Sequence, residues 1–594
     1  MILLSRSRRR LALLACLWLA ACGGGGSGDG SSAPAAPTPP PVVVEKPATR
    51  TEAARFLAQA SFGATAADVD RVLAIGYAAW IDEQLAWPAT LHRSHVEARD
   101  AELKAAGATG SATNGAGQDQ VFESFWKQAL TGPDQLRQRM VFALSQIFVI
   151  SMADDTLAGN PRAVAAWMDM LGDRGLSTYR ELLDAVSRHP MMGVYLSHLR
   201  NQKANAGSGR VPDENYAREV MQLFSIGLVA LNEDGSARTE AGKAVDTYTP
   251  SDISGLAQVF TGWSWACPDW PDSSCFFSAS ANGRSDLDHA FVAMQGYPQY
   301  HSPEEKSFLG TRIAAQSQAD PVASLRVALD ALAEHPNVGP FIGRQLIQRL
   351  VTSNPSPGYV RDVARSFANN GAGVRGDLKA VLKAVLMHPE ARRVSDTSGK
   401  VREPVLRLAA FMRAFAHSSD SGHYKVGNTD STSTSLGQTP LRSPSVFNFY
   451  RPGYVAPGTS AAARGLQAPE MQIAHETSAA GYINAMRDNI ASGVGQFNGT
   501  VAGVVRNRRD LQADYSAELA LAADAAALVD RVTFKLSLGN TGEVMRSEII
   551  DAVGRIAIPA VTTGNQTSVD NAKRVRVNAA ILLVVASPEF QVQP

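Results

Sequence analysis

Residues 134–151 read DQLRQRMVFALSQIFVIS, and this stretch does most to decide the fold. From Met140 onward most of its residues are apolar, at spacings that fit an α-helix. A helix that is apolar on nearly all sides is stable only when other elements cover it. We therefore expect a central buried helix here, surrounded by further helices.

The stretches on either side supply those helices. TEAARFLAQASF (51–62) and VFESFWKQALTG (121–132) carry apolar residues at three- and four-residue spacings, which is the pattern of an amphipathic helix. The same pattern predicts helices at 66–74, 77–87, 161–173, 177–188, 213–231, 252–262, 322–334, 338–352, 358–369, 376–387, 401–416, 468–492, 516–537, 543–556 and 569–586. Strand patterns are nearly absent, with RVTFKL (531–536) and VVRN (504–507) as the candidates. The predicted fold class is mainly α.

Two polar stretches interrupt the helices. Residues 417–443 and 493–509 contain few residues that a core would hold, so we expect surface loops or lids. His189-Pro190, His335-Pro336 and His388-Pro389 fall between predicted helices. Because proline suits the first turn of a helix, we interpret these pairs as turn markers and not as a histidine cluster.

The N-terminus carries an export signal. Arginines in MILLSRSRRR precede the apolar run LALLACLWLAA and a cleavage site of small residues, which is the three-part pattern of a signal peptide. The run is about half as long as the roughly 20 residues that a membrane-spanning helix needs. Residues 1–21 are therefore predicted to be a signal peptide. The arginines also loosely resemble a twin-arginine signal, so the export route stays open.

Leu19-Ala20-Ala21-Cys22 resembles a bacterial lipobox, in which the cysteine thiol receives a lipid. We predict an exported lipoprotein anchored in a membrane, at the outer membrane or the cell surface. The alternative is ordinary secretion with Cys22 unmodified; Cys16 is the poorer acceptor because too short an apolar run precedes it. Residues 22–49 are rich in Gly, Ser and Pro, a composition that does not fold. They are predicted to be a disordered, lipidated tether for a helical body at 50–594.

Two further cysteines, Cys267 and Cys275, lie eight residues apart in WACPDWPDSSCFF. An exported protein meets an oxidising compartment, so we expect a disulfide that closes a small loop. Two free thiols are the alternative. A zinc site needs more ligands than this stretch offers.

Composition and motifs exclude several classes of function. Lys plus Arg and Asp plus Glu both number 56, so the chain lacks the basic field on which nucleic-acid binding relies. Neither HExxH nor GxSxG occurs, which removes two common signatures of hydrolases. GAGVRG (371–376) matches GxGxxG by letters, but no strand precedes it to shape a dinucleotide site. The sequence therefore predicts no nucleic-acid partner, no metal and no cofactor.

The richest segment for chemistry is DENYAREVMQLFSIGL (213–228). As a helix it places Asn215, Arg218, Glu219 and Gln222 on one polar face. A carboxylate beside an arginine in such an apolar segment is a candidate for an acid or base whose pKa is shifted by its surroundings. A satisfied salt-bridge network is the alternative interpretation.

Several blocks together resemble a bacterial secreted family catalogued as domain of unknown function 1800. They are the segment above, YTPSDI (248–253), VFTGWSW (259–265), HSPEEKSFLG (301–310), AARFLAQASFGAT (53–65), RQRMVFALSQIFV (137–149), HPNVGPFIGRQLIQRLV (335–351), GDLKAVLKAVLMHPEAR (376–392), SVFNFYRPGY (445–454) and SPEFQVQ (587–593). The resemblance spans about residues 51–594. It implies a helix-rich secreted protein that is one large multi-helix domain, of unassigned activity.

The resemblance also implies candidate residues. Many relatives read ARELxELHxLG, whereas this chain has Gln222 and Phe224 in place of the second glutamate and the histidine, which puts any metal or acid–base role of those positions in doubt. The candidates for catalysis are Glu219 or Asp252 as base and His301 as acid. The candidates for ligand binding are Asn215, Arg218, Thr261, Gly262, Trp263 and Lys306. The implied ligand is anionic or sugar-like, with Trp263 and Trp265 as stacking surfaces; an exposed loop position for His301 and core packing for the tryptophans are the alternatives.

Two functions fit these features. The first is a tethered scaffold or binding module of the cell envelope that works with a secreted partner; by analogy with the gene neighbours of relatives, this partner resembles alkaline-phosphatase-type hydrolases. The second is an extracellular hydrolase that acts on a polymer by carboxylate and histidine chemistry. The sequence alone favours the first only narrowly.

Overall fold

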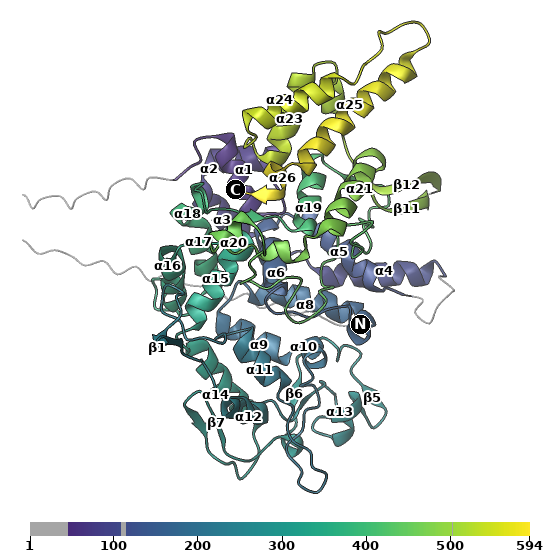
Figure 1. The fold of residues 1–594 in the computed structure, drawn as a ribbon. Coiled ribbons are helices and arrows are strands. Elements are labelled where there is room, and N and C mark those ends of the chain that lie inside the picture. The colour runs from purple at the N-terminus through teal and green to yellow at the C-terminus, as the bar shows by residue number, and fades with distance from the viewer. Residues whose placement is uncertain (1–44, 108–114, 502) are drawn as a thin grey trace, which may run out of the picture. The chain divides into compact units, whose positions relative to one another are not determined.

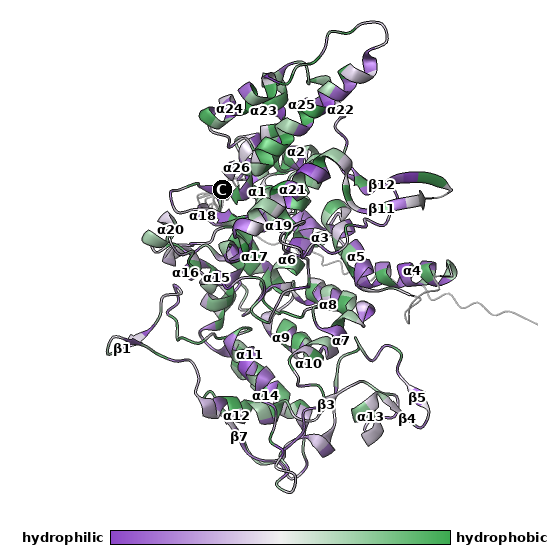
Figure 2. Ribbon diagram, turned by 45° about the vertical axis from the view of Figure 1, so that its right-hand side comes forward, coloured by the Kyte–Doolittle hydropathy of each residue, from purple (hydrophilic) through white to green (hydrophobic). Residues whose placement is uncertain are grey.

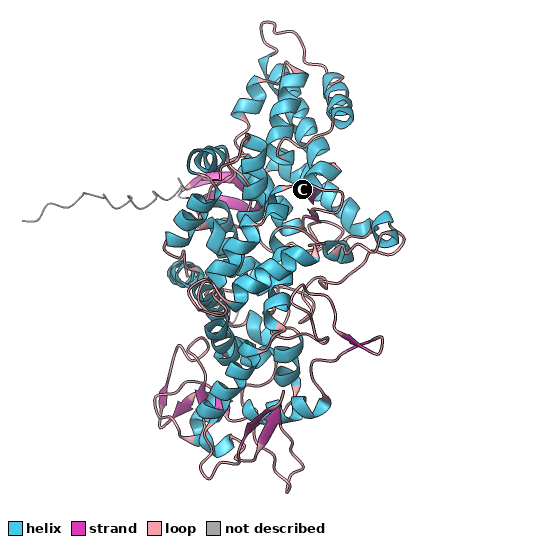
Figure 3. Ribbon diagram, turned by 90° about the vertical axis from the view of Figure 1, so that its left-hand side faces the viewer, coloured by secondary structure: helices cyan, strands magenta, loops and turns pink. Residues whose placement is uncertain are grey.

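The chain folds into one mainly helical body. The computed structural model describes residues 45–107, 115–501 and 503–594, and residues 45–594 form a single compact unit (Figure 1). Helices dominate the described residues, and the strands are short (Figure 3). The predicted mainly helical body is confirmed. The predicted signal peptide, Cys22 and most of the predicted tether lie outside the described residues.

Fourteen α-helices form the first part of the described chain. They are α1 (Arg50–Ala60), α2 (Ala66–Ile75), α3 (Tyr77–Ala86), α4 (His92–Ala105), α5 (Gln118–Thr131), α6 (Gln135–Ser145), α7 (Asp155–Ala158), α8 (Pro161–Arg174), α9 (Tyr179–Arg188), α10 (Pro190–Tyr195), α11 (Asn215–Gln222), α12 (Pro250–Val259), α13 (Ser273–Ser278) and α14 (Pro321–Glu334). Many begin at a side chain that accepts an otherwise unpaired N–H group, as Thr49, Thr178 and Thr249 do.

Twelve further α-helices complete the described body. They are α15 (Val338–Leu350), α16 (Pro357–Ala368), α17 (Leu378–Met387), α18 (Pro389–Arg392), α19 (Pro404–Ala414), α20 (Ser460–Ala463), α21 (Glu476–Ser492), α22 (Ser516–Ala520), α23 (Ala525–Ser537), α24 (Glu543–Gly554), α25 (Gln566–Ala586) and α26 (Pro588–Gln591). Most helices carry apolar and polar residues on different sides (Figure 2). Their apolar sides meet in one large core that extends from α1 to α26.

The described strands are antiparallel. They are β1 (Thr239–Glu240), β2 (Lys243–Ala244), β3 (Trp263–Ser264), β4 (Ser280–Ala281), β5 (Arg284–Ser285), β6 (Gln295–Gly296), β7 (Lys306–Phe308), β8 (Thr311–Ile313), β9 (Lys400–Val401), β10 (Ser418–Ser419), β11 (Val494–Val501), β12 (Val504–Gln512) and β13 (Val592–Gln593). β10, β12 and β11 form one three-stranded sheet, and the others pair in twos. The pair β13–β9 ties the end of the chain to its middle.

The expected central helix at 134–151 is shorter than predicted. α6 ends at Ser145, and the buried residues that follow run without a helix. There the Met152 N–H donates to Leu441 O and the Ser151 hydroxyl donates to Ser443 O. A continuous apolar run does not distinguish a buried helix from a buried extended segment, and hydrogen bonds to a distant segment decide this case.

The helix predicted at 213–231 also ends early, at Gln222. Gly227 adopts a left-handed conformation with φ of 72°, which a regular helix does not allow. Beyond it, Val229 and Leu231 form β-bridges with Asp246 and Ala237. The predicted face of polar residues therefore continues into a turn.

Two predictions about loops were wrong. Residues 493–509 contribute most of the β11–β12 hairpin, with Val494 and Leu511 buried, whereas RVTFKL lies in helix α23. The segment 417–443 does pack, because Leu436 and Gln438 are buried and Gln438 hydrogen-bonds Val405 and Glu403. Some of its polar side chains form hydrogen bonds inside the protein, and composition alone does not reveal this.

The predicted disulfide is present. Cys267 and Cys275 are bonded, with 5.6 Å between their Cα atoms. Together with Phe276, Ala281 and Tyr297 they form a small hydrophobic cluster separate from the main core. The disulfide therefore closes a loop that has its own packing.

The His-Pro pairs act as turn markers. His189 and His388 each cap the helix that follows, accepting the N–H of Met191 and of Glu390 through Nδ1. Among the described residues, no group of three or more histidines, cysteines or acids is arranged to hold a metal ion. No described helix has both the length and the apolar character that a membrane crossing requires.

Candidate functional site

The predicted residues of α11 do not share one environment. Arg218 is exposed and pairs with Glu214 at 3.4 Å, and the Asn215 amide donates to the Ser197 hydroxyl at 3.3 Å. Glu219 is only 7% exposed, and its Oε2 has no hydrogen-bond partner among the described residues. Burial raises the pKa of Glu219, and Arg218 opposes this. Glu219 is therefore a buried carboxyl group for which the charge of Arg218 does not fully offset the effect of burial.

Asp252 takes part in capping the N-terminus of α12. Its carboxylate accepts hydrogen bonds from the Thr249 N–H and hydroxyl, both at 2.7 Å, and from the Leu309 N–H, also at 2.7 Å. Burial acts to raise the pKa of Asp252, but these hydrogen bonds outweigh it and hold the pKa below the usual range. The carboxylate is ionised, and its oxygens already accept hydrogen bonds from the protein's own groups.

His301 is fully buried and bonded on both ring nitrogens. Nδ1 lies 2.8 Å from Thr261 O, and Nε2 lies 2.9 Å from Ser324 Oγ. A carbonyl oxygen only accepts, so Nδ1 carries the proton and Nε2 accepts from the serine hydroxyl. Burial lowers the pKa of His301 to about 4.

Lys306 is also fully buried, in β7, where its ammonium donates to Ser302 O at 2.7 Å and Glu304 O at 3.0 Å. Burial lowers the pKa of Lys306 to about 8. The Thr261 hydroxyl accepts the Ser302 N–H at 2.9 Å. Gly262 has φ of 78°, and a Cβ atom at this position would lie only 2.8 Å from the backbone nitrogen of His301. The structure thus joins Thr261, Gly262, His301 and Lys306 in one closed network.

A different set of residues lines a pocket of about 600 Å³, which we call the Gln345 pocket. Its walls come from the end of α6, the turn after α11, helix α15 and the segment 446–467. The lining residues are Gln146, Ile147, Gln222, Leu223, Gly227, Leu228, Val229, Leu231, Gly235, Phe341, Arg344, Gln345, Gln348, Arg349, Val446, Phe447, Arg451, Pro452, Gly453 and Gln467. Of the residues predicted for catalysis or ligand binding, none lines this pocket. Their roles stay predictions.

The Gln345 pocket is positive. Arg344, Arg349 and Arg451 line it, and none of its described lining residues is an aspartate or glutamate. Arg344 donates to the Gln467 amide oxygen at 3.1 Å, and burial lowers the pKa of Arg344. The Arg451 guanidinium lies over the Phe447 ring, 4.6 Å from its centroid. Arg344 and Arg451 therefore meet an amide and a ring where a carboxylate would balance their charges, whereas Arg349 is close enough to Glu403 and Glu470 to feel their charges.

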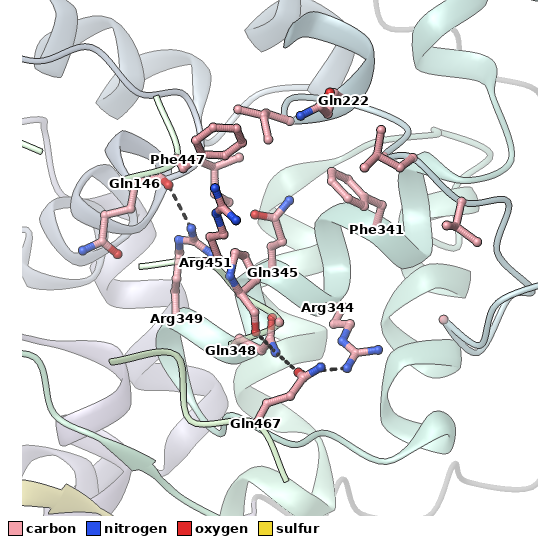
Figure 4. A pocket seen from close by; sticks show the side chains of 18 of the residues that line it. Gln146, Gln222, Phe341, Arg344, Gln345, Gln348, Arg349, Phe447, Arg451 and Gln467 are labelled. Atoms are coloured by element: carbon pink, nitrogen blue, oxygen red, sulfur yellow. Dashed lines mark hydrogen bonds between the residues drawn. The ribbon is translucent and has the colours of Figure 1, made fainter. Parts of the chain in front are cut away.

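The pocket also holds polar atoms without partners. Gln345 is 7% exposed, and its amide nitrogen has no hydrogen-bond partner among the described residues. Figure 4 shows this side chain between Arg451 and Phe341. A buried amide without partners costs about 1–3 kcal/mol. This arrangement favours a bound group that supplies the missing partner.

Arg349 connects the pocket to a buried ionic cluster. Arg139 is fully buried and donates to Arg349 O at 2.6 Å. Lys400 pairs with Glu470 at 2.9 Å, with both side chains nearly inaccessible, and Glu403 accepts from the amides of Gln146 and Gln438 at 2.6 Å each. This cluster of three cations (Arg139, Arg349, Lys400) and two carboxylates (Glu403, Glu470) carries a net positive charge next to the pocket.

One signal in the sequence could have found this pocket. Arg344, Gln345, Gln348 and Arg349 interrupt an otherwise apolar helix at positions that share one face. Gln222, placed by the sequence on a polar helix face but assigned no role, lines the pocket, whereas Phe224 is buried in the core. The remaining walls come from segments far apart in the sequence.

Comparison with known proteins gives one finding. No curated protein and no solved structure matches the chain. A family model described as "Protein of unknown function (DUF1800)" matches residues 55–592. That match spans nearly all of the helical body and agrees with the resemblance seen in the sequence blocks. The chain therefore belongs to the DUF1800 family.

Proposed function

We propose that this protein is a binding protein of the cell envelope, and that the Gln345 pocket takes a small ligand that joins an apolar part to an anionic group. One observation carries the proposal: among the described residues, three arginines and the unpaired Gln345 amide line a pocket without a carboxylate. Arginine binds carboxylates and phosphates by charge-assisted hydrogen bonds. An anion supplies the charge and the acceptors that the pocket lacks.

The rest of the pocket defines the other part of the ligand. Leu223, Leu228, Val229, Phe341 and Val446 contribute apolar surface. Small-molecule sites are typically apolar with a few polar groups that fix orientation. An uncharged ligand would leave the arginines unbalanced, and a cationic ligand would be repelled. The arrangement therefore favours an amphipathic carboxylate or phosphate.

The cellular setting of the proposal comes from the sequence. The signal at 1–21 and the lipobox at Cys22 support export and anchoring to a membrane. The family resemblance supports a secreted hydrolase-like partner, similar to alkaline phosphatases, by analogy only. In this setting the protein works as a tethered scaffold that presents or captures an anionic ligand.

The experiment compares ligands that differ only in charge. Isothermal titration with decanoate, decanol and decylamine, and with phenyl phosphate and phenol, separates the anionic contribution from the apolar one. We expect only the anions to bind. Arg451→Gln, at an exposed position of the pocket, raises the dissociation constant of the anion about tenfold or more, because a charge-assisted hydrogen bond contributes about 1.5–3 kcal/mol.

Arg393→Gln is the matched control, because Arg393 is exposed and does not line the pocket. It leaves the dissociation constant unchanged. Equal affinities for decanol and decanoate would contradict the proposal, and so would an equal effect of the two substitutions. Absence of binding for every anion would contradict it as well.

The hydrolase alternative keeps one supporting observation. Glu219 is buried with one oxygen that has no partner among the described residues, and burial raises its pKa, the direction that favours a general acid. His301 is engaged by Thr261 and Ser324 and is closed to solvent. Assays for release of sugars or peptides from envelope polymers, with Glu219→Gln beside the wild type, test this reading. Activity that disappears in the variant would favour it over binding alone.

A further inference from the structure

A second region, separate from the Gln345 pocket, consists of three neighbouring pockets of about 450, 430 and 450 Å³. Phe291 lines the first and second, and Arg180, Asp184 and Arg188 of α9 line the second and third. Shared lining residues mean that the pockets adjoin. We call the three together the α9 groove.

One wall of the α9 groove is a continuous segment of the chain, residues 287–296, whose first five residues form turns. Leu287 and residues 289–291 line the first pocket, Phe291 and Ala293 the second, and residues 294–296 the third. Helices α8 and α9, which pack on each other, form most of the opposite wall. The three pockets follow one another along this segment, so the groove is longer than any one of them and suits a chain more than a compact ligand.

The charges of the groove nearly balance. Five acidic and six basic side chains line the three pockets. Many are paired, as Arg162 is with Glu97 at 2.8 Å and Arg180 is with Asp330 at 2.6 Å. This differs from the Gln345 pocket, whose described lining has arginines and no carboxylate. A balanced set of donors and acceptors suits hydroxyl groups, which both donate and accept hydrogen bonds.

An exposed tryptophan stands at one end of the groove. Trp270 is 46% exposed, and its indole N–H donates to Gly296 O at 2.9 Å, which fixes the ring. An aromatic ring that is held in place and nearly half exposed is a surface on which an apolar ligand face can lie. Val322, 62% exposed, lies in the same pocket.

Two buried donors along the groove lack acceptors among the described residues. The Trp263 indole nitrogen has no partner, although Trp263 is 3% exposed. His189 Nδ1 accepts the Met191 N–H, so the neutral ring carries its proton on Nε2, which also has no hydrogen-bond partner. His189 packs edge-to-face with Trp167, and an aromatic face is only a weak acceptor. Both residues line the groove.

From this geometry we infer that the α9 groove binds a neutral, hydroxyl-rich polymer, a glycan chain of the cell surface. Sugar rings offer an apolar face to Trp270 and hydroxyl groups to the paired Arg and Asp side chains. Their oxygens also supply acceptors for the two unpaired donors. The inference does not rest on ligand binding in the Gln345 pocket.

Affinity electrophoresis of the purified full chain tests it. The gels contain a neutral polysaccharide (xylan, mixed-linkage β-glucan, galactomannan or dextran), alginate as an anionic polymer, or a casein digest as peptide. At least one neutral polysaccharide retards the protein, and high salt does not abolish the effect. Trp270→Ala raises the apparent dissociation constant about tenfold, whereas Trp270→Phe, which keeps a ring, loses less.

Trp87→Ala is the matched control, because Trp87 is 42% exposed and lies outside the groove, and it leaves binding unchanged. Val322→Glu blocks the groove without disturbing the fold, since an acid in the first turn of α14 suits the helix, and it abolishes retardation. Retardation by no neutral polysaccharide, or only by alginate or casein, overturns the inference. So does equal binding by the wild type, Trp270→Ala and Val322→Glu, or an equal loss in Trp87→Ala.

Discussion

The ion pair between Lys400 and Glu470 offers a sharp test of the buried cluster beside the Gln345 pocket. The two groups lie 2.9 Å apart, with side chains 0% and 2% exposed. Lys400→Met removes the positive charge and keeps most of the side-chain volume. Glu470 then stays buried without its cation, and even in the wild type one of its oxygens has no hydrogen-bond partner in the described part of the chain. Breaking one half of a buried pair destabilises a protein by about 3–5 kcal/mol.

A second ion pair provides the control. Lys383 lies 2.9 Å from Asp82, but the side chains are 41% and 59% exposed. Exposed pairs contribute at most about 1 kcal/mol. Lys383→Met therefore lowers the free energy of unfolding far less than Lys400→Met, although the two pairs have the same separation. The contrast isolates the effect of burial.

The pH dependence of the loss gives a second criterion. Burial raises the pKa of Glu470, and Lys400 opposes this, so removal of Lys400 lets the pKa rise further. A carboxyl whose pKa is higher in the folded state takes up a proton on folding, and its destabilising effect grows as pH rises through that pKa. The loss in Lys400→Met is therefore larger at pH 8 than at pH 5.

The assay is urea unfolding followed by tryptophan fluorescence at both pH values. Adding Glu470→Gln to Lys400→Met restores much of the stability at pH 8, because the uncompensated charge is gone. A loss no larger than that of Lys383→Met would refute the reasoning. A loss independent of pH, or no recovery in the double variant, would refute it as well.

Three further predictions concern other parts of the chain. Glu219→Gln raises the free energy of unfolding by about 1 kcal/mol at pH 8 and has no such effect at pH 4. The reason is that burial raises the pKa of this carboxyl group, so its charged form is the unfavourable one. Urea unfolding that shows a loss of stability at both pH values would count against this. Replacing Cys267 and Cys275 by serine lowers the stability of the small cluster around them by about 2–3 kcal/mol, which hydrogen exchange of residues 267–297 measures, with unchanged exchange as the contrary outcome. Cys22→Ser moves the protein from the membrane fraction to the soluble fraction of the host cell, whereas an unchanged distribution would exclude the lipid anchor.

Local signals made the helices predictable. Threonines at positions 49, 65, 178 and 249 cap the helices that follow them, and apolar spacing identifies the faces that pack. Proline at the first turn marks the starts of α8, α12 and α14. These features act within one or two turns, so the sequence alone carries them.

Long-range pairing was the source of the errors. The buried run after Ser145 is held by residues 441–443, and the β11–β12 hairpin is completed by β10. Polar segments such as 417–443 look like surface loops until their partners are known. Gln438, for example, is fully buried, where its amide accepts a hydrogen bond from the Val405 N–H and donates one to Glu403.

The candidate site was harder to predict for the same reason. His301 and Lys306 looked like loop residues near a ligand, but both are buried: His301 bonds the Thr261 carbonyl and the Ser324 hydroxyl, and Lys306 bonds two backbone carbonyls. The Gln345 pocket combines α15 with residues from 146 to 467. Only the polar face of α15 is visible in the sequence, and a polar face alone does not reveal a cavity.

A crystal structure of the chain grown with its tightest-binding anion tests the central claim most directly. The proposal predicts the anionic group within hydrogen-bond distance of Arg451, Arg344 and the Gln345 amide, and the apolar part against Phe341. Density for the anion at another site, with the Gln345 pocket holding only solvent, would contradict it.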